Sequence, residues 1–188
     1  SAGVAPNFGN RVISIMGDGG FWHNGLTSGV ANAVFNRDDS VLMIFNNGYT
    51  SATGAQHIPS TGTNARLEPT GQDLVSALKG VGVKWLQRVR TYEVSNMART
   101  IREAMTTKEG GLKVIIADGE CMLAVQRRKK PADRKALADG ERVVKAKFGI
   151  DDAVCTGDHS CVRLSGCPSL TIKPSGDPLK TDPVAHVD

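Results

Sequence analysis

The chain has 188 residues, of which 40% are apolar and 22% are charged, with a formal net charge of +4. This balance excludes a disordered chain and indicates a globular protein with one domain of ordinary size and an appendage. No apolar run reaches the roughly 20 residues that a membrane-spanning helix needs. Because residues 1–10 also lack the pattern of a signal peptide, a cytoplasmic protein is expected.

Two apolar runs near the start, residues 12–16 and 41–45, predict buried strands. Between them, apolar or small residues recur at positions 26, 29, 30, 33 and 34, which is the spacing of one helical face. A strand, helix, strand unit is almost always right-handed with parallel strands. Both strands should therefore end at the same edge of a sheet, where open α/β sheets bind ligands.

A polar loop follows each of these strands. The first reads Gly-Asp-Gly-Gly at positions 17–20 and the second reads Asn-Asn-Gly-Tyr at positions 46–49. Asp18 and Asn47 offer hard oxygen donors of the kind that Mg²⁺ prefers. The intervening helix, expected to begin near Asn24, would direct its amino end at the same place and favour an anion there. The loops predict a metal-bound diphosphate, and the alternative is a Rossmann-like turn with no cofactor.

The two motifs resemble the diphosphate-binding module of thiamine-diphosphate enzymes, whose signature is GDG and then NN after a gap in the mid-twenties; here the gap covers residues 20–45. The resemblance implies thiamine diphosphate and Mg²⁺ as cofactors. It implies that the metal is held by Asp18, Asn47 and the backbone carbonyl of Tyr49. The cofactor-binding positions that it implies also include the glycines Gly17, Gly19 and Gly20.

Residues 50–71 form a long segment rich in serine, threonine, glycine and proline. Long loops in compact domains tend to be functional or disordered. We expect this one to cover the bound cofactor, with Thr53, Gln56 and His57 facing the thiazolium or the substrate. His23, beside the Asp18 loop, is a second candidate for a phosphate or the reacting carbons. The alternatives are a plain surface loop and a histidine that only packs or hydrogen-bonds.

The remaining pattern continues to alternate between helix and strand. Thr70 to Asp73 resembles a capping box, and helical stripes at 74–81 and 94–105 flank strands at 84–90 and 112–118, the first of them nearer the sheet edge. Alternation of this kind predicts an α/β fold with a doubly wound, mostly parallel sheet and helices on both faces. We predict a thiamine-diphosphate and Mg²⁺ domain over residues 1–126, ending near Gln126.

A basic run follows this domain. Residues 127–147 carry nine lysines and arginines against three acidic residues, and residues 127–150 are predicted to be a basic linker or helix. A solvated face is the ordinary explanation of such a run. The functional alternatives are an acidic protein partner, such as a small acidic electron carrier, or nucleic acid. Nothing else supports nucleic acid, because aromatics make up only 5% of the chain and no reader motif is present.

Three cysteines, Cys155, Cys161 and Cys167, cluster in the last predicted segment, residues 151–188. The final Cys-Pro pair is typical of a ferredoxin ligand run, and a [4Fe-4S] cluster needs four thiolates. The ligand set is therefore incomplete, and its spacing departs from the ferredoxin pattern. The alternatives are a zinc site that adds His159, or unligated thiols in a disordered tail. Cys121 is expected to be a small buried residue.

The combination resembles the 2-oxoacid:ferredoxin oxidoreductases, and the loops at 21–25 and 53–57 resemble the indolepyruvate branch. This implies oxidative decarboxylation of an aryl 2-oxoacid, with electrons passed to iron–sulfur clusters and ferredoxin and the acyl group to coenzyme A. It also implies an oligomer in which a pyrimidine-binding module lies on another chain or in a missing segment, so that this fragment or subunit is inactive alone. The alternatives are a non-oxidative thiamine enzyme, either a decarboxylase or acetolactate-synthase-like, and a non-catalytic assembly module.

Overall fold

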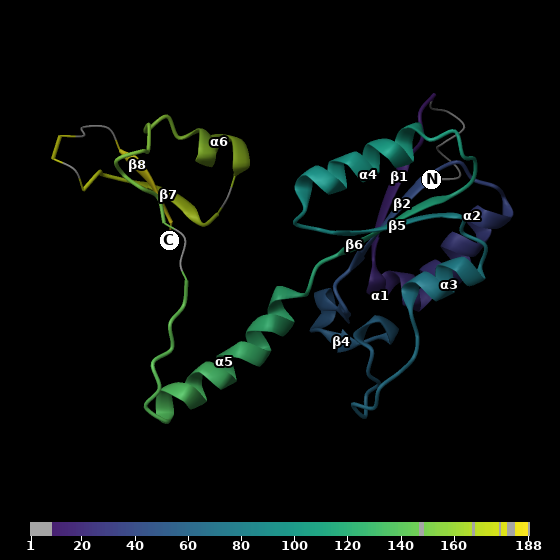
Figure 1. Ribbon diagram of the computed structural model, residues 1–188, viewed down its shortest axis with the longest axis horizontal. Coiled ribbons are helices and arrows are strands. Elements are labelled where there is room, and N and C mark those ends of the chain that lie inside the picture. Colours follow the sequence, from purple (N-terminus) through teal and green to yellow (C-terminus); the bar gives the residue numbers. More distant parts are fainter. Residues whose placement is uncertain (1–8, 147–148, 167, 177, 180–182, 188) are drawn as a thin grey trace. The chain divides into compact units, whose positions relative to one another are not determined.

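The computed structural model describes residues 9–146, 149–166, 168–176, 178–179 and 183–187. It divides the chain into two compact units, Ser1–Arg134 and Lys135–Asp188, which are treated separately below. The first unit contains the two polar loops, and the second contains the clustered cysteines. Figure 1 labels the helices and strands of both units.

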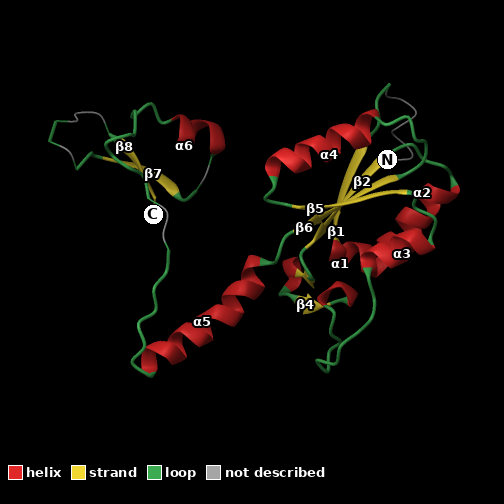
Figure 2. Ribbon diagram, viewed as in Figure 1, coloured by secondary structure: helices red, strands yellow, loops and turns green. Residues whose placement is uncertain are grey.

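A four-stranded parallel sheet forms the centre of the first unit (Figure 2). Its strands, in spatial order, are β1 (Ile13–Gly17), β2 (Val41–Asn46), β6 (Lys113–Asp118) and β5 (Trp85–Arg90). All neighbouring strands pair in parallel, and β5 lies at an edge of the sheet, as its alternating sequence predicts. The predicted α/β class with a mostly parallel sheet is confirmed.

Helices cover both faces of this sheet (Figure 1). One face packs against η2 (Phe21–Ala31), α2 (Asn32–Phe35) and α3 (Leu74–Gly80), and the other against α4 (Val94–Thr106). Successive strand residues point to opposite faces, so in β2 Leu42 and Ile44 join the first core while the flanking Val41 and Met43 join the second. The doubly wound arrangement predicted from the alternating elements is confirmed.

Two predicted helix starts were wrong. Helical structure begins at Asp18 with α1 (Asp18–Gly20), directly after β1, and not near Asn24. It continues as a π-helix over η2, and the glycine-rich start has no apolar periodicity that could reveal it. The cap of α3 is Asp73, whose carboxylate accepts a hydrogen bond from the Ser76 N–H at 2.8 Å, and not Thr70.

The long segment after β2 is an ordered, folded-back loop. It contains β3 (Tyr49–Thr50), η3 (Ser51–Thr53), β4 (Gln56–His57) and η4 (Pro59–Thr61), and β3 pairs with β4 in antiparallel fashion. The indole N–H of Trp22 in η2 donates to the Ser60 hydroxyl at 2.7 Å. This bond ties the loop to the helix that begins at Asp18.

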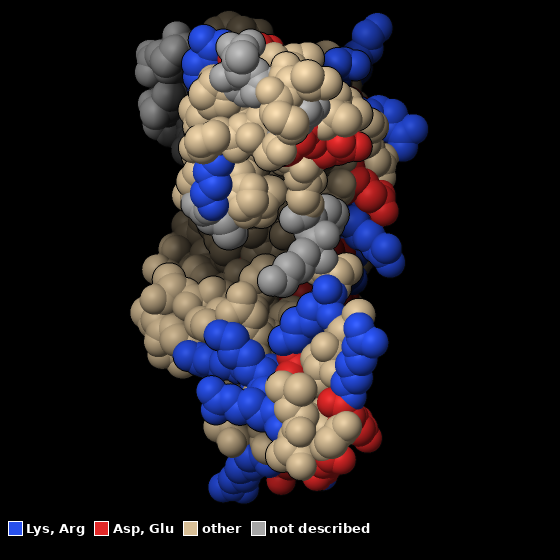
Figure 3. Space-filling view, turned by 90° about the vertical axis from the view of Figure 1, so that its left-hand side faces the viewer, with Lys and Arg blue, Asp and Glu red and all other residues tan. Residues whose placement is uncertain are grey.

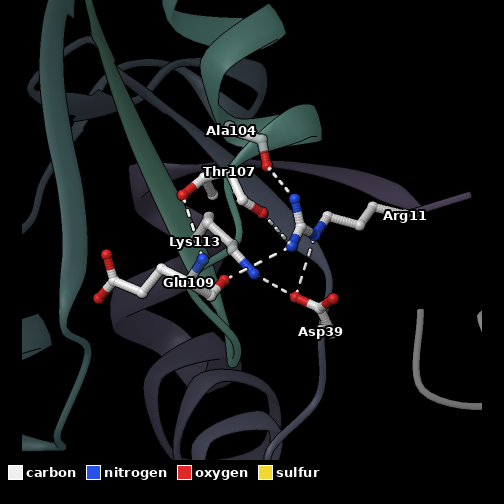
Figure 4. Close-up of polar contacts among 6 residues, drawn as sticks. All are labelled: Arg11, Asp39, Ala104, Thr107, Glu109 and Lys113. Atoms are coloured by element: carbon white, nitrogen blue, oxygen red, sulfur yellow. Dashed lines mark hydrogen bonds and ion pairs between the residues drawn. The ribbon is translucent and has the colours of Figure 1, made fainter.

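A charged cluster lies at the amino ends of the sheet strands, where β1, β2 and β6 begin (Figure 4). Lys113, the first residue of β6, is fully buried, and its ammonium group donates to Asp39. Arg11 donates to the same carboxylate at 3.0 Å and to the carbonyls of Ala104 and Thr107 at 3.1 and 2.6 Å, where α4 ends. Burial raises the pKa of Asp39, but the hydrogen bonds from Lys113 and Arg11 outweigh it and lower that pKa overall.

The helix α5 (Met122–Ala138) runs through the position of the predicted boundary at Gln126 and contains Pro131. The second unit has a short helix, α6 (Ser160–Ser165), and an antiparallel pair formed by β7 (Leu170–Lys173) and β8 (Val184–Val187). In the part of the chain that the structure describes, no helix is both long and apolar enough to cross a membrane.

Candidate functional site

The two polar loops meet at the carboxyl edge of the sheet. β1 and β2 run side by side with Gly17 opposite Phe45, so the residues that follow them are neighbours. The Asp18 carboxylate joins the loops, because one oxygen accepts the Gly48 N–H at 2.8 Å and the other accepts the Gly19 N–H at 3.0 Å. The structure therefore places the aspartate of the first motif against the backbone of the second.

Asp18 is a buried charge, with only 1% of its surface exposed. Burial raises the pKa of its carboxyl, and the N–H bonds from Gly48 and Gly19 only partly offset this effect. Among the residues that the structure describes, no ion pair reaches Asp18. Each carboxylate oxygen accepts one N–H and keeps a further lone pair. A divalent cation would use these lone pairs and balance the charge, so the donor chemistry fits Mg²⁺.

The second loop is held in a tight turn. The side-chain oxygen of Asn47 accepts the Tyr49 N–H at 3.0 Å, and its backbone oxygen accepts the Cys121 N–H at 3.4 Å. Gly48 between them has a φ of +81°, in the left-handed region that favours glycine. Asn47 and Tyr49 therefore flank Gly48, the residue whose N–H contacts Asp18.

The folded-back loop packs directly on the first motif. A Cβ added to Gly19 would lie 2.8 Å from the hydroxyl oxygen of Thr50 and 3.3 Å from its Cα. Only glycine allows this approach without a shift of β3. The loop therefore contacts the first motif, and its predicted role in covering a bound cofactor stays a prediction.

The other candidate residues are exposed. Thr53 and Gln56 bond to each other across the turn between β3 and β4, with the Gln56 amide donating to the Thr53 carbonyl at 3.0 Å. The Nδ1 atom of His57 lies 3.1 Å from the Thr63 hydroxyl, and its ring packs edge-on against Tyr49. His23 lies on an exposed position of η2. Their predicted roles remain predictions.

Sequence reasoning missed a polar chain beside the site. The Asn46 side-chain amide donates to Asp118 at 2.7 Å, and Arg88 donates to both oxygens of the same carboxylate, at 2.5 and 3.1 Å. Gly119 N–H donates to the Asn46 carbonyl at 3.1 Å, which holds the start of the second loop. The signal was available, because Asp118 ends an apolar strand and a parallel sheet brings it opposite Asn46.

The cysteines of the described chain fall in two places. Cys121 is buried, as predicted, where α5 begins beside Asn47. Cys155 and Cys161 line one pocket of the second unit, and Cys167 lies outside the described residues. Within the described ranges, no three histidine, cysteine or acidic side chains are grouped closely enough to hold a single metal ion.

The fold and the joined loops define an α/β domain in which two polar motifs meet at the carboxyl ends of the first two parallel strands. The family described as "Thiamine pyrophosphate enzyme, C-terminal TPP binding domain" matches residues 2–117, which is more than half of the chain. The chain belongs to this family. The match includes both polar loops and the sheet that carries them, up to the last but one residue of β6.

Within this family the chain is similar to indolepyruvate oxidoreductase subunit IorA. The identity is 28% with that subunit from Archaeoglobus fulgidus, over 93% of this chain and 30% of the relative. It is 29% for Methanothermobacter marburgensis, over 94% of this chain and 31% of the relative, and 26% for Pyrococcus abyssi, over 94% and 26%. The chain thus spans less than a third of each relative, and the similarity extends into the second unit.

A solved structure, the thiamine diphosphate-dependent 4-hydroxybenzoylformate decarboxylase of Rhodococcus jostii RHA1, is 21% identical, with a TM-score of 0.41 over 58% of this chain and 20% of that one. This likeness is too distant to bear on function.

Proposed function

We propose that this chain supplies the Mg²⁺- and diphosphate-binding part of a thiamine-diphosphate-dependent 2-oxoacid:ferredoxin oxidoreductase that acts on an aryl 2-oxoacid such as indolepyruvate. The observation that carries the proposal is the environment of Asp18. Its carboxylate is buried, it forms no ion pair with a lysine, arginine or histidine among the described residues, and it accepts the Gly48 N–H of the second loop at 2.8 Å. Membership of the thiamine pyrophosphate family and similarity to IorA subunits support the same assignment.

The roles of the residues follow from their donors. Asp18, the side chain of Asn47 and the carbonyl of Tyr49 would hold Mg²⁺. Asp18 also begins the helix, so the amino end of that helix favours an anion beside it. When bound, thiamine diphosphate supplies the electron sink for loss of CO₂, while the protein binds and orients. Thr53 and Gln56, with His57 and His23, are proposed to face the cofactor or the substrate.

Electron transfer is proposed for the second unit. Cys155, Cys161 and Cys167 are the proposed thiolate ligands of a [4Fe-4S] cluster within residues 151–188. A zinc site that includes His159 is the competing assignment. The Nε2 atom of His159 lies 3.1 Å from the Pro183 carbonyl, which accepts but cannot donate, so this nitrogen must carry a proton. Its other ring nitrogen is available to a metal, and a zinc-ligating histidine usually makes such a bond to a carbonyl, so this contact is compatible with both assignments.

The proposed partners are ferredoxin, coenzyme A and a pyrimidine-binding thiamine module outside this sequence, in an oligomeric cytoplasmic enzyme. Figure 3 shows lysine and arginine side chains gathered in its lower half, where α5 lies. Those on α5 are exposed, and they are Arg127, Arg128, Lys129, Lys130, Arg134 and Lys135. Such a surface attracts an acidic electron carrier.

Calorimetry on the full chain tests the cofactor proposal. We expect thiamine diphosphate to bind only when Mg²⁺ is present, and weakly, because the pyrimidine-binding module is supplied elsewhere. Asp18→Asn keeps the size of the side chain but removes the charge, and should lower the affinity by about tenfold or more, the usual range for groups that support a metal site. Glu120→Gln, an exposed carboxylate two residues after Asp118, is the control and should bind as the wild type does.

Two results would contradict the proposal: equal affinity with and without Mg²⁺, or unchanged affinity in Asp18→Asn. Turnover of a 2-oxoacid by this chain alone would contradict the need for a separate pyrimidine-binding module. Bound iron and sulfide separate the oxidoreductase from a non-oxidative thiamine enzyme. Asp18→Ala in the complete complex separates both from an assembly module, because activity should collapse in an enzyme and persist in a scaffold.

A further inference from the structure

A pocket of about 450 Å³ in the second unit brings together side chains that bind metals. Its lining includes Cys155, Asp158 and Cys161, together with His159. Cys155 precedes α6 and Cys161 lies on its first turn, with Asp158 in the loop between them. Two thiols and a carboxylate thus line one pocket.

The spacing of these three residues is regular. Two residues separate Cys155 from Asp158, and two separate Asp158 from Cys161. The first three ligands of a ferredoxin run, C-x₂-C-x₂-C, have this spacing, so Asp158 stands where the second cysteine would be. We propose that Asp158 is the missing ligand, so that a carboxylate oxygen holds one iron of the cluster. This inference rests on the proposed iron–sulfur role.

The carboxylate is able to take this role. Asp158 is exposed, and its oxygens accept hydrogen bonds from the Ser160 N–H at 3.1 Å and the Ser160 hydroxyl at 2.7 Å. The Thr156 side chain is a third hydrogen-bond partner, which leaves one of the roughly four lone pairs of the carboxylate for an iron. The same bonds hold the carboxylate at the start of α6, and Arg163 donates to the Asp158 carbonyl.

The three side chains border one volume. A cubane distributes its protein ligands over four iron atoms, so its ligands surround a volume and do not meet at a point. Cys155, Asp158 and Cys161 line one pocket and thus border such a volume. A mononuclear zinc site needs its ligands at one point, and no three metal-binding side chains of the described residues are grouped in that way.

A carboxylate ligand has a chemical consequence. Iron–sulfur sites select soft thiolates, and a hard oxygen donor holds its iron less firmly. Oxidation by ferricyanide should therefore take one electron from the four-iron form and release the iron at Asp158 as Fe²⁺. The product keeps three irons and four sulfides and carries a charge of 1+. Together with the released Fe²⁺ and the electron that ferricyanide accepts, this equals the 2+ charge of the starting cluster.

The test uses the full chain, reconstituted anaerobically with Fe²⁺ and sulfide. Iron and acid-labile sulfide are counted, and electron paramagnetic resonance follows the cluster during ferricyanide oxidation. In the wild type, one iron in four should be lost as the three-iron signal appears. Asp158→Cys should retain all four irons, and Asp158→Asn should carry three irons per four sulfides from the start.

Asp151→Asn is the matched control. Asp151 lines the same pocket and accepts the N–H two residues ahead at 2.9 Å, as Asp158 does, but it lies off the ligand spacing. This variant should behave like the wild type. If the wild type binds a cluster whose iron content and oxidation are the same in both Asp158 variants, the assignment is overturned while the iron–sulfur proposal stands. If the wild type binds no iron and sulfide, both are overturned.

Discussion

Asp18 is a buried carboxylate that accepts hydrogen bonds from backbone N–H groups, those of Gly19 and Gly48, within the described part of the chain. Desolvation of a carboxylate is costly unless hydrogen bonds or a cation offset it. Asn46 and Arg88 both donate to Asp118 at the same end of the sheet, and the buried Asn46 Oδ1 atom has no hydrogen-bond partner among the described residues. At the scale of single residues, Asp118 thus has a cationic partner in Arg88, whereas Asp18 has none among the described residues.

The raised pKa of Asp18 predicts the pH dependence of binding. Protons and Mg²⁺ compete for the ionised carboxylate, so Mg²⁺-dependent affinity for thiamine diphosphate should be full at neutral pH. It should fall on acidification, beginning at a higher pH than for an ordinary aspartate, because burial raises this pKa. Calorimetry over a pH series measures the midpoint. An affinity that stays constant down to the ordinary aspartate range would contradict the prediction.

The raised pKa of Asp18 also makes the free energy of unfolding depend on pH. A raised pKa means that the folded chain binds the proton more tightly than the unfolded chain does. Without metal, protonated Asp18 favours folding, and this contribution is lost as the pH rises through the raised pKa. Added Mg²⁺ should recover stability on the neutral side.

Lys113 is a buried charge that does have a partner, because its ammonium group pairs with the Asp39 carboxylate. Asp39→Asn should lower the free energy of unfolding by about 2 kcal/mol, less than for a fully buried pair because Asp39 is half exposed. Because the pKa of Asp39 is lowered, this contribution is present above the ordinary aspartate pKa and is lost as the pH falls through the lowered value. Denaturant unfolding measures both effects.

The control for this prediction removes the buried charge itself. Lys113→Met in the Asp39→Asn background should recover most of the lost stability, because a buried charge is then no longer left unpaired. An Asp39→Asn variant within about 0.5 kcal/mol of the wild type, the range of ordinary surface substitutions, would show that solvent already satisfies Lys113.

At the scale of elements, the site depends on β3 lying against the start of α1. Gly19 is the contact point, whereas a Cβ on Gly20 meets nothing within 4 Å. Gly20 also has ordinary helical angles, with φ of −64°. Alanine substitution at each of these two glycines therefore separates the effect of a steric overlap from the effect of replacing a glycine.

Gly19→Ala should weaken binding of thiamine diphosphate by about tenfold, because relieving the overlap with Thr50 costs about 1–3 kcal/mol and shifts β3. Gly20→Ala adds no overlap with the protein, so its loss of binding should be smaller, and its helix should be slightly more stable. Calorimetry and thermal unfolding of the two variants provide the comparison. Equal losses in both variants would mean that the contact with Thr50 is not limiting.

The elements themselves were largely predictable. Each of the four strands was visible as an apolar or alternating run of five to seven residues, because burial on one or both faces is written in local sequence. The start of α1 was not, since glycine and aspartate carry no periodic signal, and the ordered loop after β2 was not, since its two-residue strands are too short to show one.

At the scale of the whole molecule, charge is concentrated on α5, the element between the cofactor domain and the cysteine segment. Reversal of Arg128, Lys129 and Lys130 to Glu should weaken binding of an acidic ferredoxin by about tenfold at low salt, with the difference shrinking as salt screens the charges. A triple reversal of exposed lysines elsewhere is the control, namely Lys79, Lys84 and Lys108. Equal weakening in both triple variants would indicate a general charge effect without a defined surface.

The sequence by itself determined the class of fold, the order of strands and helices along the chain, and the two polar motifs that follow β1 and β2. These are properties of neighbours in the chain, expressed as periodicity and loop chemistry. Only the tertiary structure decided that the Gly48 N–H reaches Asp18, and that Asp118 holds Asn46, because those partners are 30 and 72 residues apart in sequence. Such contacts depend on strand register and loop conformation, which long-range packing sets and local pattern does not encode.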